Sequence, residues 1–148
     1  MATSTKSSSK KNLVAEHPKA LIIAEKPSVA NDIAKALGGF TKHDEYFEND
    51  AFLISSAVGH LLEIAAPEEY EVKRGKWSFA NLSVIPPHFD LRPIAKTESR
   101  LKVLQKLIKR KDVNRIINAC DAGREGELIF RLITQHAKAP QKIERLWL

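Results

Sequence analysis

Short apolar runs recur along this chain and are separated by longer, mostly polar stretches. The runs are rich in Ala, Ile, Leu and Val, which is typical of strands buried in a parallel sheet. They lie at residues 20–24, 51–58, 115–120 and 141–148. We therefore expect a strand at each of these positions. The polar residues 40–49 predict a hairpin with a turn at Asn49-Asp50.

Apolar residues at helical spacing lie between these runs. The first predicted helix covers residues 28–37, with Ser28 as its N-cap and two glycines at its end. The second covers residues 97–111, with Thr97 as a candidate cap and a basic outer face. The third follows the run at 115–120. Strands and helices therefore alternate over most of the chain.

This alternation predicts an α/β fold, with a mostly parallel sheet that is covered by helices on both faces. Residues 65–94 interrupt it, because their prolines and aromatic residues predict an irregular excursion. The excursion could pack on the core through Trp77 and Phe79, or it could form a short edge ribbon. Right-handed crossovers bring the ends of the strands at 20–24 and 115–120 to one edge of the sheet.

The composition indicates a basic protein of one domain. The 148 residues carry a formal net charge of +6, and the pI is about 9.5. We place the domain at residues 20–148, after a disordered basic tail at residues 1–19. A basic surface fits a polyanionic partner such as nucleic acid, although a mildly positive charge is common among proteins.

The chain shows no run with the length of a membrane span and no apolar signal-peptide core at its start. We therefore expect no membrane partner. Its single cysteine, Cys120, excludes a disulfide framework and a thiolate metal site, and is expected to be a small buried residue. These features suit a reducing cytoplasm.

Three acidic residues fall in one predicted strand-to-helix turn, Asp121-Ala122-Gly123-Arg124-Glu125-Gly126-Glu127, in which two glycines are expected to give backbone freedom. The topology places Glu25, which follows another strand, beside Asp121. Crowded carboxylates repel one another unless a cation lies among them, and Mg²⁺ prefers oxygen ligands. The plainer interpretation is that acidic residues favour helix N-termini. For Glu127 the helix preference explains the residue as well as a cation site does. For Glu25 and Asp121 it is the weaker explanation.

Several segments carry a resemblance to a known family. Residues 121–129 resemble the acidic motif of the Toprim domain, the metal-binding fold shared by topoisomerases, DnaG-type primases and some nucleases. Ala24-Glu25-Lys26-Pro27-Ser28 is similar to the first Toprim motif of type IA topoisomerases of the topoisomerase III group. The segments Gly59-His60-Leu61-Leu62-Glu63, 86–94 and Arg145-Leu146-Trp147 resemble the same group. The resemblance covers residues 20–148.

The resemblance implies the roles of several acidic residues. Type IA topoisomerases cut one DNA strand through a tyrosyl-phosphate, pass another strand through the gap and reseal it. Their Toprim domain contributes a catalytic glutamate, which Glu25 matches, and acidic ligands of Mg²⁺, which Asp121 and Glu125 match. Glu25 is a further candidate ligand, and Glu127 is a candidate support for the ligands.

The resemblance also implies basic residues at the same site. Lys26 and Arg124 match residues near the scissile phosphate, so we expect them to act in catalysis and in DNA binding. His60 matches a histidine of the family's Gly-His-Leu motif, for which a structural role and a DNA contact both stay open. The implied partners are DNA, in particular single-stranded DNA, and the remaining topoisomerase domains. The implied location is the cytoplasm, in association with the nucleoid.

Two departures from the family pattern change what is expected. Many relatives have Asp-x-Asp where this chain has Asp121-Ala122-Gly123, which makes one Mg²⁺ a safer expectation than two. The nucleophilic tyrosine of the family belongs to a later domain, and neither Tyr46 nor Tyr70 has its sequence context. We therefore expect a Toprim portion that does not relax DNA alone.

Two other functions stay open at this point. A free-standing Toprim nuclease or primase-like enzyme would use the same metal site and a water molecule, with no need for a tyrosine. A non-catalytic nucleic-acid-binding module would use the basic helix at 97–111 and the lysine-rich tail. The module leaves the clustered acids unexplained.

Overall fold

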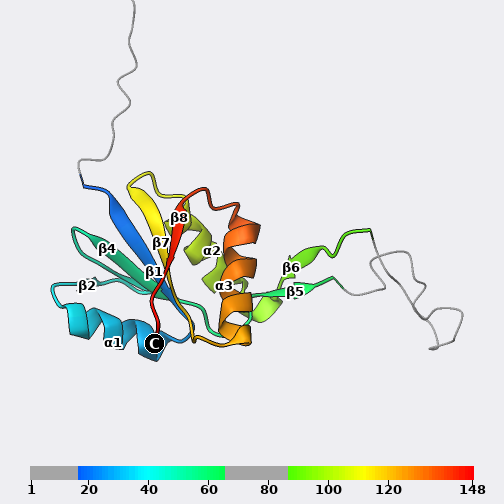
Figure 1. Ribbon diagram of the computed structural model, residues 1–148, viewed down its shortest axis with the longest axis horizontal. Coiled ribbons are helices and arrows are strands. Elements are labelled where there is room, and N and C mark those ends of the chain that lie inside the picture. Colours follow the sequence, from blue (N-terminus) through cyan, green and yellow to red (C-terminus); the bar gives the residue numbers. More distant parts are fainter. Residues whose placement is uncertain (1–16, 66–86) are drawn as a thin grey trace, which may run out of the picture.

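The computed structural model describes residues 17–65 and 87–148, which form a central sheet with helices on both faces (Figure 1). The six strands of this sheet lie in the order β2-β3-β4-β1-β7-β8. Their bounds are β1 (Lys19–Ala24), β2 (Thr41–Lys42), β3 (Tyr46–Glu48), β4 (Phe52–Ser56), β7 (Val113–Ala119) and β8 (Lys142–Arg145). The strands β4, β1, β7 and β8 are parallel, and the hairpin of β2 and β3 adds an antiparallel edge.

The helices cover the two faces of this sheet unequally. They are α1 (Pro27–Leu37), the short 3-10 helix η3 (Ala95–Thr97), α2 (Glu98–Ile108) and α3 (Arg124–Ala137). The larger core joins apolar residues of α2 and α3 to one face, with Phe130 and Leu104 fully buried. The smaller core packs Ala30 and Ala34 of α1 on the other face. The α/β fold with helices on both faces is therefore confirmed.

The interrupting segment begins and ends in a separate ribbon. The strands β5 (Leu62–Ile64) and β6 (Leu91–Pro93) pair antiparallel outside the main sheet, and they project to one side in Figure 1. The last residues of the Gly59–Glu63 segment belong to β5. Residues 1–16 and 66–86 lie outside the described part, and so do Trp77, Phe79 and most of the predicted tail.

The ends of the helices differ in part from the predicted caps. Helix α1 begins at Pro27 and not at Ser28, because proline is well suited to the first turn and its fixed φ matches a helix. Helix α2 begins at Glu98, so Thr97 is its N-cap residue as predicted, but the Thr97 hydroxyl donates to the Ile94 carbonyl at 3.3 Å and makes no capping bond. The turn at Asn49 is confirmed, since its side-chain oxygen accepts from the amides of Ala51 and Phe52 at 2.9 and 2.7 Å.

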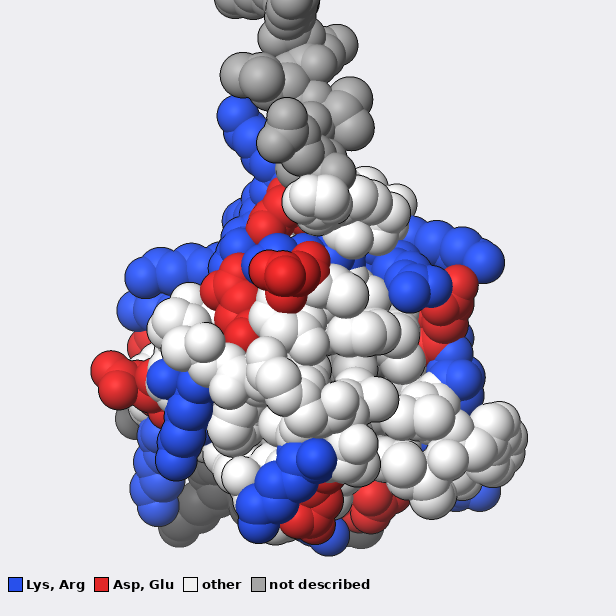
Figure 2. Space-filling model, turned by 90° about the vertical axis from the view of Figure 1, so that its left-hand side faces the viewer, with Lys and Arg blue, Asp and Glu red and all other residues white. Residues whose placement is uncertain are grey.

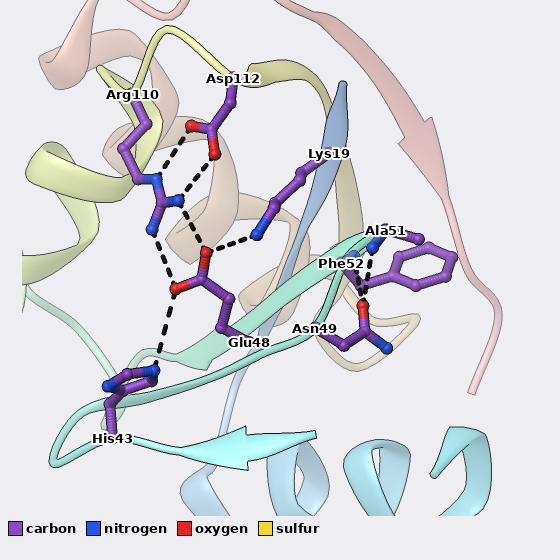
Figure 3. Close-up of polar contacts among 8 residues, drawn as sticks. All are labelled: Lys19, His43, Glu48, Asn49, Ala51, Phe52, Arg110 and Asp112. Atoms are coloured by element: carbon purple, nitrogen blue, oxygen red, sulfur yellow. Dashed lines mark hydrogen bonds and ion pairs between the residues drawn. The ribbon is translucent and has the colours of Figure 1, made fainter. Parts of the chain in front are cut away.

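The amino ends of the parallel strands are held by a network of ion pairs (Figure 3). At the end of β3, the Glu48 carboxylate accepts from Nη1 and Nη2 of Arg110 at 3.2 and 2.7 Å and from Nζ of Lys19 at 2.5 Å. Arg110 also binds Asp112 through Nε at 2.9 Å and Nη2 at 2.7 Å. The network links β1 and β3 to the segment that joins α2 to β7. We call this end of the sheet the amino edge.

No helix in the part of the chain that the structure describes is long and apolar enough to cross a membrane.

Candidate functional site at the carboxyl edge of the sheet

The carboxyl ends of β1 and β7 lie side by side, as the topology predicted, and acidic residues follow both. Ala24 pairs with Ala119 at the end of the two strands. Glu25 comes directly after β1, and Asp121 comes two residues after the end of β7. Ligands of open α/β sheets bind at the carboxyl ends of strands. We call this end of the sheet, which carries Glu25, Asp121 and Glu125, the acidic edge.

A close contact at Gly126 shows how near these residues lie. A Cβ atom built on Gly126 would lie 2.4 Å from the backbone oxygen of Asp121 and 3.0 Å from Oε2 of Glu25. The carboxylate of Glu25 therefore lies against the turn that carries Asp121. Gly126 is buried in the first turn of α3, and no side chain fits between this helix and the turn.

The two glycines of the turn act differently from the prediction. Gly123 is the N-cap residue of α3 with φ −111° and ψ 173°, an extended conformation that any residue can adopt. Gly126 is helical. The prediction that these two glycines supply backbone freedom to the turn is therefore wrong. The structure shows instead that Gly126 is needed because helix α3 starts in contact with the Asp121 backbone.

The carboxylates of the acidic edge are only loosely neutralised. Nζ of Lys26 lies 3.9 Å from Oδ2 of Asp121, and Nε2 of His60 lies 3.5 Å from Oε1 of Glu125. The side chains of Asp121 and Glu125 remain 56% and 73% exposed. Ion pairs at such distances and exposure contribute little free energy. Their oxygens are therefore available to a ligand.

Two helix N-termini also begin at this edge. Lys26 is the N-cap residue of α1, and Arg124 is the first residue of α3, and both side chains are exposed. The N-cap residues of both helices, Lys26 and Gly123, make no side-chain bond to the first amides. Free amides at a helix N-terminus, together with an exposed Lys and Arg, form an environment that favours a phosphate group.

Glu127 has a different environment from the other acids. Its carboxylate accepts from Nε of Arg131 at 2.7 Å, Nη1 of Arg145 at 2.9 Å and Nδ2 of Asn118 at 2.9 Å. These three donors engage both of its oxygens, one at Oε1 and two at Oε2. Glu127 is therefore tied to α3, β7 and β8 more firmly than Asp121 or Glu125 is to any partner.

Arg145 is a residue of the site that the sequence did not single out. Its Nη2 donates to the carbonyls of Cys120 and Asp121, each at 3.0 Å, while Nη1 binds Glu127. Its guanidinium carbon also lies 5.7 Å from the centroid of the Trp147 ring. One side chain at the end of β8 thus holds the backbone on which Asp121 stands. The only signal for it was its place in the Arg145-Leu146-Trp147 motif.

Two residues with reactive side chains are packed against their neighbours. Cys120 is fully buried, and burial raises the pKa of its thiol to about 12, which confirms a small packed residue. Tyr46 is partly buried against the larger core, and its ring stacks on His43 with the centroids 4.5 Å apart. Tyr70 lies outside the described residues.

The donor set fits a hard cation only in an open site. The described residues contain no group of three or more His, Cys, Asp or Glu side chains that could hold a metal ion by themselves. Mg²⁺ does not need such a cage, because it is commonly bound by one or two carboxylates, several waters and phosphate oxygens. The exposed carboxylates of Asp121 and Glu125 suit this mode. They do not suit a closed structural metal site.

Comparison with known proteins agrees with this geometry. The sequence profile of the Toprim domain matches residues 20–148. A protein named DNA topoisomerase 3 from Bacillus cereus is 43% identical over 130 residues, which are 88% of this chain and 18% of the relative. DNA topoisomerase 3 from Staphylococcus aureus is 44% identical over the same length and shares. The chain thus spans about a fifth of the length of these curated relatives.

Proposed function

Because this chain belongs to the Toprim domain family, we propose that it forms the metal-binding part of the site at which a type IA DNA topoisomerase cuts and reseals one DNA strand. The observation that carries the proposal is the contact of Glu25 with the Asp121 turn at the ends of two adjacent parallel strands. The match to proteins named DNA topoisomerase 3 supports the choice among Toprim enzymes.

In this proposal Asp121 and Glu125 hold one Mg²⁺, with Glu25 as a third ligand or a close neighbour. When bound, the ion neutralises charge on the phosphodiester and keeps it in position. Gly123 stands where many relatives have a second Asp, so the chain offers no carboxylate there for a second ion. Arg145 and Glu127 hold the turn, and thereby the direction of the Asp121 side chain.

The remaining residues act on the DNA strand itself. Lys26 and Arg124 bind the scissile phosphate at the start of α1 and α3. Glu25 moves a proton to or from the oxygen that leaves or attacks the phosphorus, as a positioned carboxyl group can. His60, next to Glu125, contacts the same strand or keeps Glu125 in place. The partner is a single DNA strand, and the location is the cytoplasm near the nucleoid.

The nucleophilic tyrosine must come from outside this chain in this mechanism. Tyr46 is stacked and partly buried, and its place on β3 is at a different strand from the acidic edge. The 148-residue chain is therefore expected to bind Mg²⁺ and DNA but not to relax supercoiled DNA by itself.

A first experiment tests the metal site by the stability of the chain. Mg²⁺ at about 100 times its dissociation constant should raise the free energy of unfolding by about 2.7 kcal/mol. Asp121→Asn should remove most of this gain. Asp32→Asn, which changes an exposed acid on α1, is the matched control and should keep it. Equal gains in both variants would contradict the proposed site.

A second experiment tests the reaction. The chain is mixed with the remaining segment of the Bacillus cereus DNA topoisomerase 3, and relaxation of negatively supercoiled DNA is followed. Relaxation that requires both pieces, and that is lost with Glu25→Gln, is the expected result. Failure with both pieces folded and associated would contradict it. Mg²⁺-dependent nicking of single-stranded DNA by the chain alone, also lost with Glu25→Gln, would favour the nuclease instead.

A further inference from the structure

A groove at the amino edge lies at the opposite end of the sheet from the acidic edge. It is an open hollow of about 660 Å³ between the end of α2, the start of β7 and the end of α3. Strand β1 has six residues, so the two edges are separated by about 20 Å along the strand. The groove is therefore separate from the site described above.

The lining of this groove carries charge of one sign. Its basic residues are Lys109, Arg110, Lys111 and Lys138, and none of the described residues that line it is acidic. Arg110 is occupied by Glu48 and Asp112, so it contributes little free charge. The three lysines are exposed, and within residues 17–65 and 87–148 none of them makes an ion pair. Three uncompensated positive charges therefore surround one hollow.

Lysines often lie at helix C-termini because they stabilise the terminal carbonyls. This role is the simpler alternative to binding a ligand. Here other groups already bind those carbonyls. The amide of Lys109 donates to Gln105, the amide of Lys138 donates to Gln135, and Nε2 of Gln141 donates to the Ile108 carbonyl at 2.6 Å. The ammonium groups of the three lysines are thus not used in capping.

Figure 2 shows the distribution of charge on one side of the molecule. Uncharged residues occupy the middle of this face, and both basic and acidic side chains gather around its upper end, where the chain enters β1. That end is the amino edge. Two acidic residues of this edge, Glu48 and Asp112, are neutralised by Arg110 and Lys19, and exposed Asp50 is one negative charge against the three lysines. The net field of the amino edge is therefore positive.

We propose that the groove lined by Lys109, Lys111 and Lys138 binds the phosphate backbone of a nucleic acid, independently of the acidic edge. Lysines on flexible stems attract phosphates as point charges. The described residues that line the groove include no aromatic side chain on which bases could stack. The contact therefore depends on charge and not on base sequence. The groove is thus a second DNA-binding site, and it needs no metal ion.

The test compares two triple variants of the full chain with equal net charge. The groove variant changes Lys109, Lys111 and Lys138 to Gln, and the control changes Lys35, Lys42 and Lys96, which are also exposed. Binding of a labelled single-stranded oligonucleotide is measured in EDTA across a salt titration. Each lost phosphate contact lowers the slope of log affinity against log salt by about 0.7, so the groove variant should lose about 2 units.

In the control variant, the slope of log affinity against log salt should decrease by less than half as much as in the groove variant. A second oligonucleotide of different sequence should give the same decreases. Equal losses in the two variants would show that only net charge matters and would overturn the proposal. Binding to phosphatidylserine vesicles that falls in the groove variant, with unchanged DNA binding, would assign the groove to a membrane surface and would also overturn it. Because EDTA is present throughout, failure here says nothing against the metal site.

Discussion

The two ends of the central sheet carry similar charged residues in opposite arrangements. At the amino edge, Glu48 and Asp112 are largely buried and lie 2.5 to 3.2 Å from Lys19 and Arg110 (Figure 3). At the acidic edge, Nε2 of His60 lies 3.5 Å from Glu125, and Nζ of Lys26 lies 3.9 Å from Asp121. The first arrangement neutralises its charges within the protein, and the second leaves them available to a ligand.

The pKa values at the amino edge agree with this difference. The Arg110 guanidinium holds the pKa of the Glu48 and Asp112 carboxyls below their usual values, and burial opposes it without reversing the effect. The pKa of Arg110 is raised in return. Folding therefore favours the charged form of both carboxylates. The comparison indicates that the charges of the amino edge stabilise the fold. Four substitutions test this difference between the two edges.

The largest effect is expected at Gly126. In Gly126→Ala the new Cβ would lie 2.4 Å from the Asp121 carbonyl oxygen, which is backbone and cannot move away easily. We expect a loss of about 3 kcal/mol in the free energy of unfolding, measured in urea, and a loss of Mg²⁺ binding.

Gly123→Ala is the control for this change, because a Cβ at Gly123 meets no atom within 4 Å. It should cost less than about 1 kcal/mol, the difference between Gly and Ala as an N-cap residue. Equal losses for the two variants would mean that the close contact between α3 and the turn is not what holds the acidic edge.

The next largest effect is expected at Arg110. In Arg110→Met two partly buried carboxylates, Glu48 and Asp112, lose their main partner. We expect a loss of about 2 kcal/mol in the free energy of unfolding. Arg115→Met is the control, since Arg115 meets Glu144 at 3.4 Å and is half exposed, and it should cost less than about 0.5 kcal/mol. A larger loss of stability in Arg115→Met than in Arg110→Met would contradict the distinction between partly buried and exposed ion pairs.

The same network predicts a pH dependence. Because the pKa of Glu48 is lower in the folded protein than in the unfolded chain, its contribution is complete above the ordinary value of 4.5 and is lost as the pH falls below it. The stability difference between the wild type and Glu48→Gln should therefore shrink on acidification, as urea unfolding at several pH values would show. In an Arg110→Met background this pH dependence should be much weaker, because Arg110 is its main cause.

The smallest effect is expected at Glu125 in the absence of metal. Its side chain is mostly exposed, and its one ion pair among the described residues is the long contact to His60. Glu125→Gln in EDTA should therefore change the free energy of unfolding by less than about 0.5 kcal/mol. With Mg²⁺ the same variant should lose the stabilisation seen in the wild type. A large loss in EDTA would show that Glu125 serves the fold and would remove the contrast between the two edges.

Prediction from the sequence succeeded where local patterns determine structure. The apolar run at 20–24 became β1, and the stripe of Leu101, Leu104 and Leu107 became the buried face of α2. Helix starts were less certain: Thr97 is the N-cap residue of α2 as predicted, but α1 begins one residue before Ser28, because several neighbouring residues can serve as an N-cap. For the candidate site, the order of strands was enough to bring Glu25 and Asp121 to one edge.

The sequence by itself determined the alternation of strands and helices and the acidic turn after a buried strand, because hydrophobic periodicity and short motifs are local properties. Only the tertiary structure decided which acids are free and which are paired. Glu127 meets Arg145 across 18 residues, Glu48 meets Arg110 across 62, and Gly126 lies against the Asp121 backbone. These contacts depend on how elements pack, and that is decided by the whole core and not by any one segment.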